Sequence, residues 1–533
     1  MRSALWGIVV AGSTLAGGLT LGAACGSRPT ECIELYTCPL GGGGSPGSSS
    51  STSSSSSTAT GTGGGPPATC VPTAGMAPVD NTCGIFVSSS FGADGPNAGS
   101  KVKPYKTLAA AIAAAGPAKK PVYACAETFT ETLTVAVGVG VYGGLDCTKK
   151  WSYAEGGKST LTTDADAVPL TLSASANGAS LFDFKVQAAG AMLAGGSSIA
   201  VIADQVTAAF TRCDFIAGNG KDGLAGVMST VGVGPKSDST DPLIRGNNGS
   251  DACASATMSF GGGARDNALC PFASGGPIGG SGGQGAVPNG GPGDIQPVAT
   301  MQTALGGQGE TSAGWGCFGG SGLADGGANG QAGPDGLGAA GLTSLGTFGI
   351  SGYVGVSGAP GDLGKPGQGG AGGGGAKGKA GCAGASGGGG GAGGCGGHGG
   401  TGGQAGGASI ALVSLSATLA FDTVTSKLGT GGAGGDGGDS QDGGVGGFGG
   451  FGGKAASGTL KACYGGGGGQ GGGGGKGGGG RGGHAIGMAA TGSVALDTKG
   501  VKFSQKGTIG LGGKGGPSQD GDPGVLADVQ VFP

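Results

Sequence analysis

Hydrophobic residues along this chain gather in short runs, most of them between residues 83 and 217. The runs are rich in Val, Ile, Leu and Phe and are bounded by Gly, Asn or Asp, as at residues 133–137, 181–186 and 199–202. Runs of this length with these boundaries are typical of β-strands, and they follow one another without helices between them. This part of the chain is therefore expected to hold the core.

One helix is predicted before these strands. Thr107 can cap it, and its apolar side carries residues at the spacing i, i+3, i+4 and i+7, namely Leu108, Ala111, Ile112 and Ala115. Gly116 and Pro117 then end the helical pattern.

An internal repeat organises the apolar segments. One copy runs over residues 195–220, a second over 406–431 and a looser third over 482–510. Each copy has the pattern of a strand, a turn, a second strand and a glycine-rich exit. Because one such copy cannot bury its apolar face alone, the copies are expected to stack. Stacking would place Ile199, Ile410 and Ile486 against one another.

Long glycine tracts, residues 218–405 and 430–482, separate the copies and are too long for ordinary loops. Glycine recurs every third residue in places, such as 327–336 and 358–370. This is the period of a polyproline-II helix. Fixing a glycine costs about 0.5–1 kcal/mol relative to alanine, and a hydrogen bond contributes about 0.5–1.5 kcal/mol. Since these terms nearly cancel, both packed polyglycine helices and a disordered coat remain open.

The N-terminus has the pattern of an export signal. Arg2 precedes an uncharged apolar run over residues 4–21, and three small residues then precede Cys25. This order predicts a signal peptide at 1–24 and resembles a bacterial lipobox, so that Cys25 would carry a lipid anchoring the chain to a membrane, at the outer membrane or cell surface. Ordinary cleavage that leaves Cys25 unmodified is the alternative. A Ser/Gly/Thr-rich flexible linker at 41–68 follows the lipidated segment 25–40.

The fourteen cysteines contain no Cys-x-x-Cys pair, a usage that indicates an oxidising compartment. Cys382 and Cys395 lie near His398, and either a disulfide between these two cysteines or two flexible thiols are favoured over a metal site. The disulfide candidates are Cys32, Cys38, Cys70, Cys83, Cys125, Cys147, Cys382 and Cys395.

Three segments together resemble the opening of the pectin-lyase-like right-handed parallel β-helix proteins: residues 86–88, 103–108 and 141–147. The resemblance implies an all-β solenoid with a short N-terminal capping helix and long glycine-rich insertions. It also implies a disulfide between Cys125 and Cys147 across neighbouring windings. The β-helix would then comprise residues 69–217, 406–429 and 483–533, interrupted by insertions at 218–405 and 430–482.

The chain as a whole resembles glycine-rich surface lipoproteins of myxobacterial type, and its glycine tracts resemble those of PE-PGRS proteins in composition. The resemblance implies a non-enzymatic cell-surface lipoprotein acting in envelope structure, adhesion or matrix contact, with extracellular polysaccharide or other surface proteins as partners. The alternative is a polysaccharide-binding protein, or a polysaccharide lyase or hydrolase of the pectin-lyase-like fold.

Enzymes of that fold use carboxylates with an Arg or Lys, often with calcium. Here the candidates are Asp204, Arg212 and Asp214, and an ion pair between Arg212 and Asp214 is the simpler interpretation. Convergence of the three in an aromatic-walled groove would favour carbohydrate chemistry. No catalytic residue, cofactor or metal is otherwise expected; calcium at residues 431–436 is left as an alternative.

Charged residues make up 11% of the chain and the formal net charge is −3. Nucleic-acid binding requires a basic stripe that neutralises phosphates, and the sequence contains none. Nucleic acid is therefore excluded as a partner.

Overall fold

The computed structural model describes residues 70–230, 239–268, 270, 277–298, 301–311, 315–317, 325–340, 344–492 and 496–533. All of them belong to one compact unit, residues 64–533. The predicted signal peptide, the lipidated segment with Cys25, Cys32 and Cys38, and the linker lie outside the described residues.

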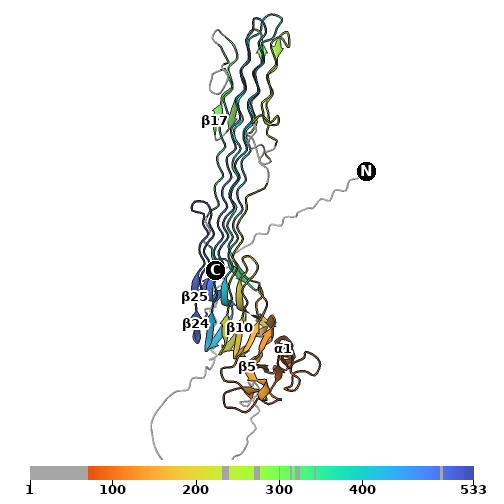
Figure 1. Ribbon diagram of the computed structural model, residues 1–533, viewed down its shortest axis with the longest axis vertical. Helices are drawn as coiled ribbons and strands as arrows, with labels where there is room; N and C mark the ends of the chain where they lie inside the picture. Colours follow the sequence, from red (N-terminus) through yellow and green to blue (C-terminus); the bar gives the residue numbers. More distant parts are fainter. Residues whose placement is uncertain are drawn as a thin grey trace, which may run out of the picture. The chain divides into compact units, whose positions relative to one another are not determined.

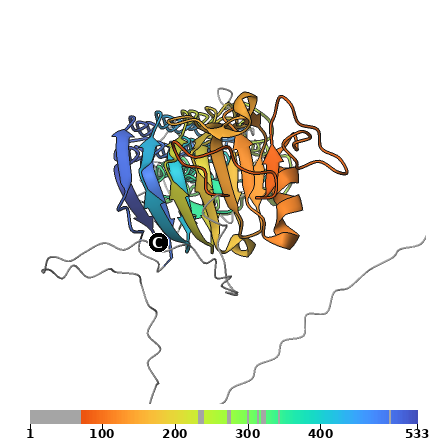
Figure 2. The same cartoon turned by 90° about the horizontal axis from the view of Figure 1, so that it is seen from below.

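Most of the strands form three sheets whose neighbouring strands run parallel (Figures 1 and 2). Sheet A has the order β1 (Ile85–Val87), β2 (Val122–Cys125), β5 (Gly140–Asp146), β9 (Ala179–Phe182), β12 (Thr207–Thr211) and β21 (Thr418–Asp422), with β6 (Ser152–Tyr153) antiparallel to β5. Sheet B has the order β24 (Val501–Gln505), β22 (Val424–Lys427), β13 (Asp214–Ile216), β10 (Phe184–Gln187), β7 (Ser159–Thr162) and β3 (Thr128–Thr130). Sheet C has the order β25 (Leu526–Phe532), β23 (Ala485–Thr491), β20 (Ser409–Leu415), β11 (Ser198–Asp204), β8 (Leu170–Leu172) and β4 (Leu133–Val135).

The remaining elements are short. Helix α1 (Leu108–Ala115) begins at Thr107, whose hydroxyl accepts a hydrogen bond from the Ala110 N–H at 3.2 Å, as predicted. Three 3₁₀ turns are η2 (Gly116–Ala118), η3 (Cys147–Lys149) and η4 (Ala174–Ala176). Three antiparallel pairs are β14 (Met258–Ser259) with β15 (Gly285–Ala286), β16 (Gln296–Val298) with β17 (Met301–Ala304), and β18 (Thr347–Gly349) with β19 (Gly352–Val354). None of the helices in the described part of the chain has the length and hydropathy needed to span a bilayer.

The prediction of an all-β right-handed parallel β-helix is wrong. The structure supports parallel sheets A, B and C in an α/β-like arrangement with few helices. Helix α1 packs against β1, β2 and β4, and all four predicted apolar positions of the helix lie in the same hydrophobic core as the strands. The apolar runs specified which residues form strands and which faces are buried, but such runs do not determine the fold class.

The predicted stacking of the repeat copies is confirmed by the strand register. Ile199 pairs with Ile410, which in turn pairs with Ile486. The second strands of the first two copies also align, with the Phe210 and Phe421 rings stacked 5.9 Å apart. Inward-facing apolar residues from all three sheets fill the core between them, and Phe184, Phe210 and Phe215 are at most 1% exposed.

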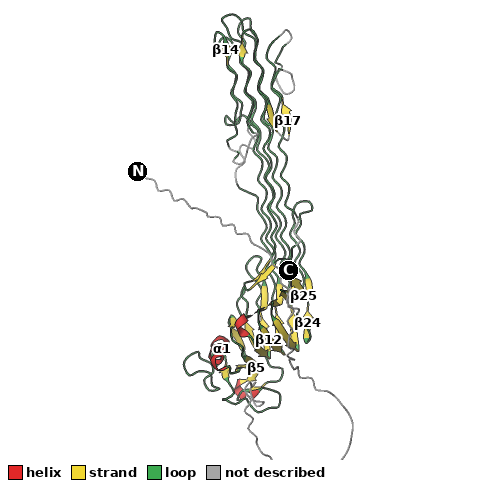
Figure 3. Ribbon diagram, turned by 180° about the vertical axis from the view of Figure 1, so that it is seen from behind, coloured by secondary structure: helices red, strands yellow, loops and turns green. Residues whose placement is uncertain are grey.

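The glycine tracts form ordered extended chains that run side by side where the structure describes them (Figure 3, drawn as loops). We call these residues, within 218–405 and 430–483, the glycine array. Donors at Gly391, Gly394 and Gly397 bond to carbonyls at Gly466, Gly469 and Gly472, at 2.8–2.9 Å. The contacts therefore repeat every three residues, the period of a polyproline-II-type helix.

The close approach of neighbouring chains explains the high glycine content of the array. A Cβ on Gly390 would lie 1.9 Å from the Gly370 carbonyl oxygen, and one on Gly391 would lie 1.9 Å from the Gly447 oxygen. The next position, Ala392, does carry a side chain, and Cys395 follows one turn later. Two of every three positions on this inner chain thus face neighbouring backbones that leave no space for a side chain.

Asn and Asp side chains complete the hydrogen bonding at the edges of the array. Asn329 accepts a bond from the Gly467 N–H at 2.8 Å, Asp335 from Gly473 at 2.7 Å and Asp222 from Ala433 at 2.7 Å. Each of these oxygens takes the place of a backbone carbonyl from a further chain. Asn and Asp residues at regular positions therefore help to determine how the chains of the array align.

Five disulfides link the described cysteines: Cys70–Cys83, Cys125–Cys147, Cys253–Cys382, Cys270–Cys395 and Cys317–Cys463. The Cys125–Cys147 pairing implied by the resemblance is confirmed. The predicted Cys382–Cys395 pairing is wrong, because the two residues lie on one extended chain. Thirteen residues at a ~3.1 Å rise separate them by about 40 Å, so each pairs with a neighbouring chain instead.

Candidate functional site

Arg212, the central candidate for carbohydrate chemistry, forms a structural ion pair. Its Nε and Nη2 each donate to an Asp183 carboxylate oxygen at 2.7 Å, and Asp183 is only 4% exposed. Tyr153 donates a further hydrogen bond to the same carboxylate at 3.1 Å. The bond to Asp183 raises the pKa of the Arg212 guanidinium above its already high value. This bidentate geometry is that of a strong charge-assisted pair, in which Asp183 is buried and the Arg212 side chain is 40% exposed.

Asp214 has different partners. Lys158 Nζ lies 2.7 Å from its Oδ2, and the Thr425 hydroxyl donates to its Oδ1. Partial burial pushes the pKa of Asp214 upward, but the bonds from Lys158 and Thr425 and the lysine charge outweigh this, so its pKa lies below the ordinary value. A carboxylate held in its charged form is a poor general acid.

The three candidates therefore do not act together. Asp204 ends β11 in sheet C, in register with Leu415, whereas Arg212 follows β12 in sheet A and Asp214 begins β13 in sheet B. The simpler interpretation, an ion pair between Arg212 and Asp214, is also wrong, because each residue binds a different partner.

The remaining candidates for metal binding are engaged in structural contacts. Cys382 and Cys395 are in disulfides, and Asp436 accepts a hydrogen bond from the Lys514 N–H at 2.6 Å. Within the described residues, no group of three or more His, Cys, Asp or Glu side chains is arranged to hold a metal ion.

The structure shows instead a groove along the glycine array. Its floor is the chain 463–476, and its walls are mainly the chains 326–338 and 440–451, with residues 239–245 and Cys317 added at one end and residues 516–519 at the other. Two consecutive hollows, of about 800 and 550 Å³, occupy successive stretches of these three chains. We call the whole feature the array groove, and the larger hollow its aromatic end.

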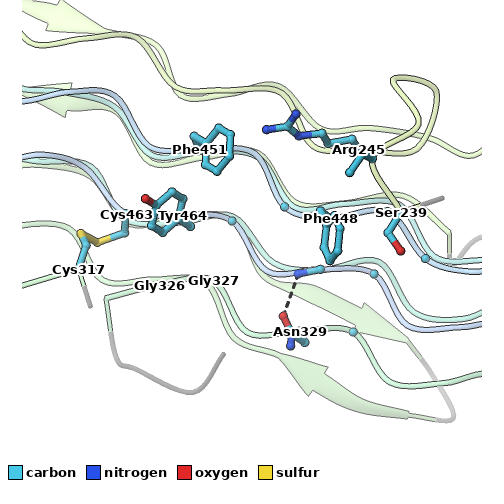
Figure 4. Close-up of a pocket in the computed structure, with 18 residues that line it drawn as sticks. Ser239, Arg245, Cys317, Gly326, Gly327, Asn329, Phe448, Phe451, Cys463 and Tyr464 are labelled. Carbon is cyan, nitrogen blue, oxygen red and sulfur yellow. Dashed lines mark hydrogen bonds between the residues drawn. A yellow bond between two sulfur atoms is a disulfide. The ribbon is translucent and has the colours of Figure 1, made fainter. Parts of the chain in front are cut away.

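Three rings and one cation line the aromatic end (Figure 4). Phe448 and Phe451 are 56% and 52% exposed, and Phe451 meets the Tyr464 ring edge-on with centroids 5.5 Å apart. The Arg245 guanidinium carbon lies 4.6 Å from the centroid of the Phe451 ring, a cation–π contact. The Cys317–Cys463 disulfide fixes the chain directly before Tyr464.

The packing of the neighbouring glycines explains why the Phe448 and Phe451 rings point outward. A Cβ on Gly447 would lie 2.0 Å from the Ile244 oxygen, and one on Gly449 would lie 1.9 Å from the Gly465 oxygen. Only the third position of each turn is open to solvent, and that position carries Phe448 and then Phe451. Earlier on the same row are the exposed carboxylates Asp436, Asp439 and Asp442.

At two positions of the groove floor, chain packing does not require glycine. A Cβ on Gly467 or Gly473 would meet nothing closer than 3.6 Å, an ordinary van der Waals distance. Gln470, midway between them, does carry an exposed side chain. Glycine at 467 and 473 therefore keeps the groove clear without being needed for chain packing.

The three-residue period of the glycines was recognised in the sequence, but the side chains that stand between them were not, and this groove was therefore missed. A signal was present: Phe448 and Phe451 are spaced by one polyproline-II turn with two glycines between them. The partner chains bearing Arg245 and Asn329 could not be identified, since nothing local fixes which distant glycine segments become neighbours.

In comparisons with known proteins, no family model, no curated protein and no solved structure matches this chain.

Proposed function

We propose that this chain is an exported, non-enzymatic surface protein, held to a membrane by a lipid on Cys25, that acts in envelope structure, adhesion or matrix contact. Support for export comes from the signal-like pattern of residues 1–24 and from disulfides, which persist in oxidising compartments.

The observation that carries the structural role is the cross-linked glycine array. Its chains are joined by repeating backbone hydrogen bonds and by three disulfides, each spanning more than 120 residues of sequence. Such an array resists local opening, because separating one chain breaks bonds to several neighbours at once. A rigid element that presents regularly spaced side chains suits a protein whose role is contact.

Cleavage of polysaccharide gains no support from the candidate residues. Arg212 and Asp214 are held in separate ion pairs, and Asp204 belongs to a different sheet. We therefore expect purified protein to release no products from pectin, alginate or chitin, with or without calcium. Product formation that is lost in Arg212→Gln would overturn the non-enzymatic role.

Fractionation of cells tests the anchor. Cys25→Ser is expected to move the protein from the membrane fraction to the soluble fraction, because the acyl chains that hold it can no longer be attached. Cys213→Ala serves as the control: Cys213 is buried, pairs with none of the other described cysteines and is far from the signal in sequence. Membrane retention of Cys25→Ser equal to that of this control would refute the lipid anchor.

A further inference from the structure

We propose that the aromatic end of the array groove binds a proline-rich polypeptide segment in the polyproline-II conformation, with an acidic side chain of that segment placed against Arg245. The proposal deepens the contact role proposed above by naming the partner, and it does not depend on the lipid anchor.

The spacing of the groove matches such a ligand. Phe448 and Phe451 stand one turn apart on a chain of three-residue period, at about 9 Å from the ~3.1 Å rise per residue. A polyproline-II ligand lying along the groove has the same period, so every third ligand residue would meet an equivalent ring. Proline-rich segments dock in aromatic-lined grooves in this way, since their conformation is fixed before binding.

The hydrogen bonding of the floor selects a ligand without N–H donors. At the aromatic end, the carbonyls of Tyr464 and Gly467 already accept bonds from the N–H groups of Gly327 and Gly330. The N–H groups of Gly467 and Gly468 donate to the Asn329 side chain and to the Gly447 carbonyl. A further glycine chain would bring a backbone N–H at every residue to a floor whose groups are already paired. Proline lacks that N–H and brings apolar ring surface instead.

The charges along the groove determine where an acidic residue of the ligand would lie. No carboxylate in the described part of the chain forms an ion pair with Arg245, although its guanidinium lies at the edge of the aromatic end. The exposed Lys454 follows Phe451 by one turn in the same row. Asp335 and Asp442 line the other hollow. The one lysine among the described residues of that hollow, Lys476, is paired with Asp439 at 3.4 Å. An acidic side chain would therefore be attracted to the aromatic end and repelled from the opposite end.

Binding to the purified full-length protein tests the ligand class. The probe is a synthetic peptide of Pro-Pro-Glu repeats, measured by titration calorimetry against a matched peptide of Pro-Pro-Gln repeats. We expect the Glu peptide to bind about tenfold more tightly, since its carboxylate accepts a charge-assisted hydrogen bond from Arg245 whereas the Gln amide is uncharged. A flexible peptide of Gly-Gly-Glu repeats should bind at least about tenfold more weakly than the Pro-Pro-Glu peptide, because it must be ordered on binding.

Variants test the site. Phe451→Ala should weaken binding of both Pro-rich peptides by about tenfold, and Arg245→Gln should abolish the preference for the Glu peptide. Gly467→Gln copies the side chain that Gln470 already presents and should block the aromatic end. Gly473→Gln, its matched control, places the same side chain in the other hollow and should leave binding at the aromatic end unchanged.

The outcomes separate this proposal from the broader contact role. Equal binding by Gly467→Gln and Gly473→Gln, or no binding of the Pro-Pro-Glu peptide, overturns the proposed site. Tighter binding of polygalacturonate or chitin oligosaccharides, blocked by Gly467→Gln, would keep the groove as a contact site and replace the peptide by a glycan. Unchanged thermal stability of each variant confirms that lost binding does not reflect unfolding.

Discussion

The three sheets and the glycine array both align chains through backbone hydrogen bonds, but they fill the space between the chains in opposite ways. In the sheets the interior consists of side chains such as Phe184, Leu161 and Phe215, which are at most 1% exposed. In the array the interior consists of backbone, and a Cβ on most inner glycines would lie about 2 Å from a neighbouring carbonyl oxygen. One region is stabilised mainly by apolar burial, and the other by hydrogen bonding between closely approaching chains.

The difference predicts opposite responses to mutation. The sheets should lose stability when a side chain is removed, whereas the array should lose stability when one is added. A disulfide or a hydrogen-bonding side chain should contribute most to stability where neither apolar burial nor local sequence fixes which chains are neighbours.

The largest effect is expected from shortening a core side chain in the sheets. Phe184→Ala should lower the free energy of unfolding by about 3–5 kcal/mol, through lost burial and the cavity left behind. Urea unfolding followed by far-UV circular dichroism measures it. A loss below about 1 kcal/mol would show that this interior is not closely packed.

Removal of a long-range disulfide should come next. The double variant Cys253→Ser with Cys382→Ser opens a link across 129 residues of sequence and should cost about 2–5 kcal/mol. Hydrogen exchange should show faster opening near residues 384–390 while strands β10 and β11 stay protected. Equal loss of protection in both regions would mean that the sheets depend on the array.

A single methyl group should distinguish the two kinds of glycine in the array. Gly393→Ala places a Cβ 1.9 Å from the Gly367 oxygen and should destabilise the protein by about 1–3 kcal/mol. Gly467→Ala, where the nearest atom is 3.6 Å away, should be nearly neutral. Thermal unfolding of both variants gives the comparison, and equal effects would contradict the close approach seen at Gly393.

The smallest effect concerns His484, at the junction between β23 and the array. Its Nδ1 accepts a hydrogen bond from the Val525 N–H and its Nε2 donates to the Leu345 carbonyl, both at 2.8 Å. Burial lowers the pKa of the His484 ring below its usual 6.5, and the Arg481 charge adds to this against the opposing Leu345 bond.

The unfolded chain therefore takes up a proton at a higher pH than the folded chain does. The contribution of His484 to stability should be complete above about pH 6.5 and should decrease as the pH falls below that value. Urea midpoints measured between about pH 7.5 and pH 5 should show this slope, and His484→Gln should reduce it. A slope unchanged in the variant would assign the pH dependence to other groups.

Local signals in the sequence were sufficient for the strands, the helix and the stacking of the repeats. Thr107 and the apolar spacing up to Ala115 fix α1, and the matching copies at Ile199, Ile410 and Ile486 fix a register. The helix depends on residues that are close together in the sequence, and the strand register depends on segments that repeat. Both features can therefore be predicted from the sequence pattern.

The sequence was insufficient to predict which of several similar segments, far apart along the chain, become neighbours in the fold. Cys382 could not be matched to Cys253, nor Phe451 to Arg245, because glycine segments differ too little for pattern alone to specify their neighbours. The fold class was missed for a related reason, since strand-length apolar runs do not fix how sheets and helix combine. The ion pair of Arg212 with Asp183 likewise joins residues on different strands.

Hydrogen exchange of the glycine amides tests the central claim, that the array is held together by its backbone, most directly. Amides at Gly391, Gly394, Gly397 and Gly400 each donate to the neighbouring chain at 2.8–3.0 Å and should exchange far more slowly than in an unstructured glycine peptide. Protection should be comparable to that of Val201 and Leu412 in sheet C. Exchange at the rate of the unstructured peptide would contradict the account.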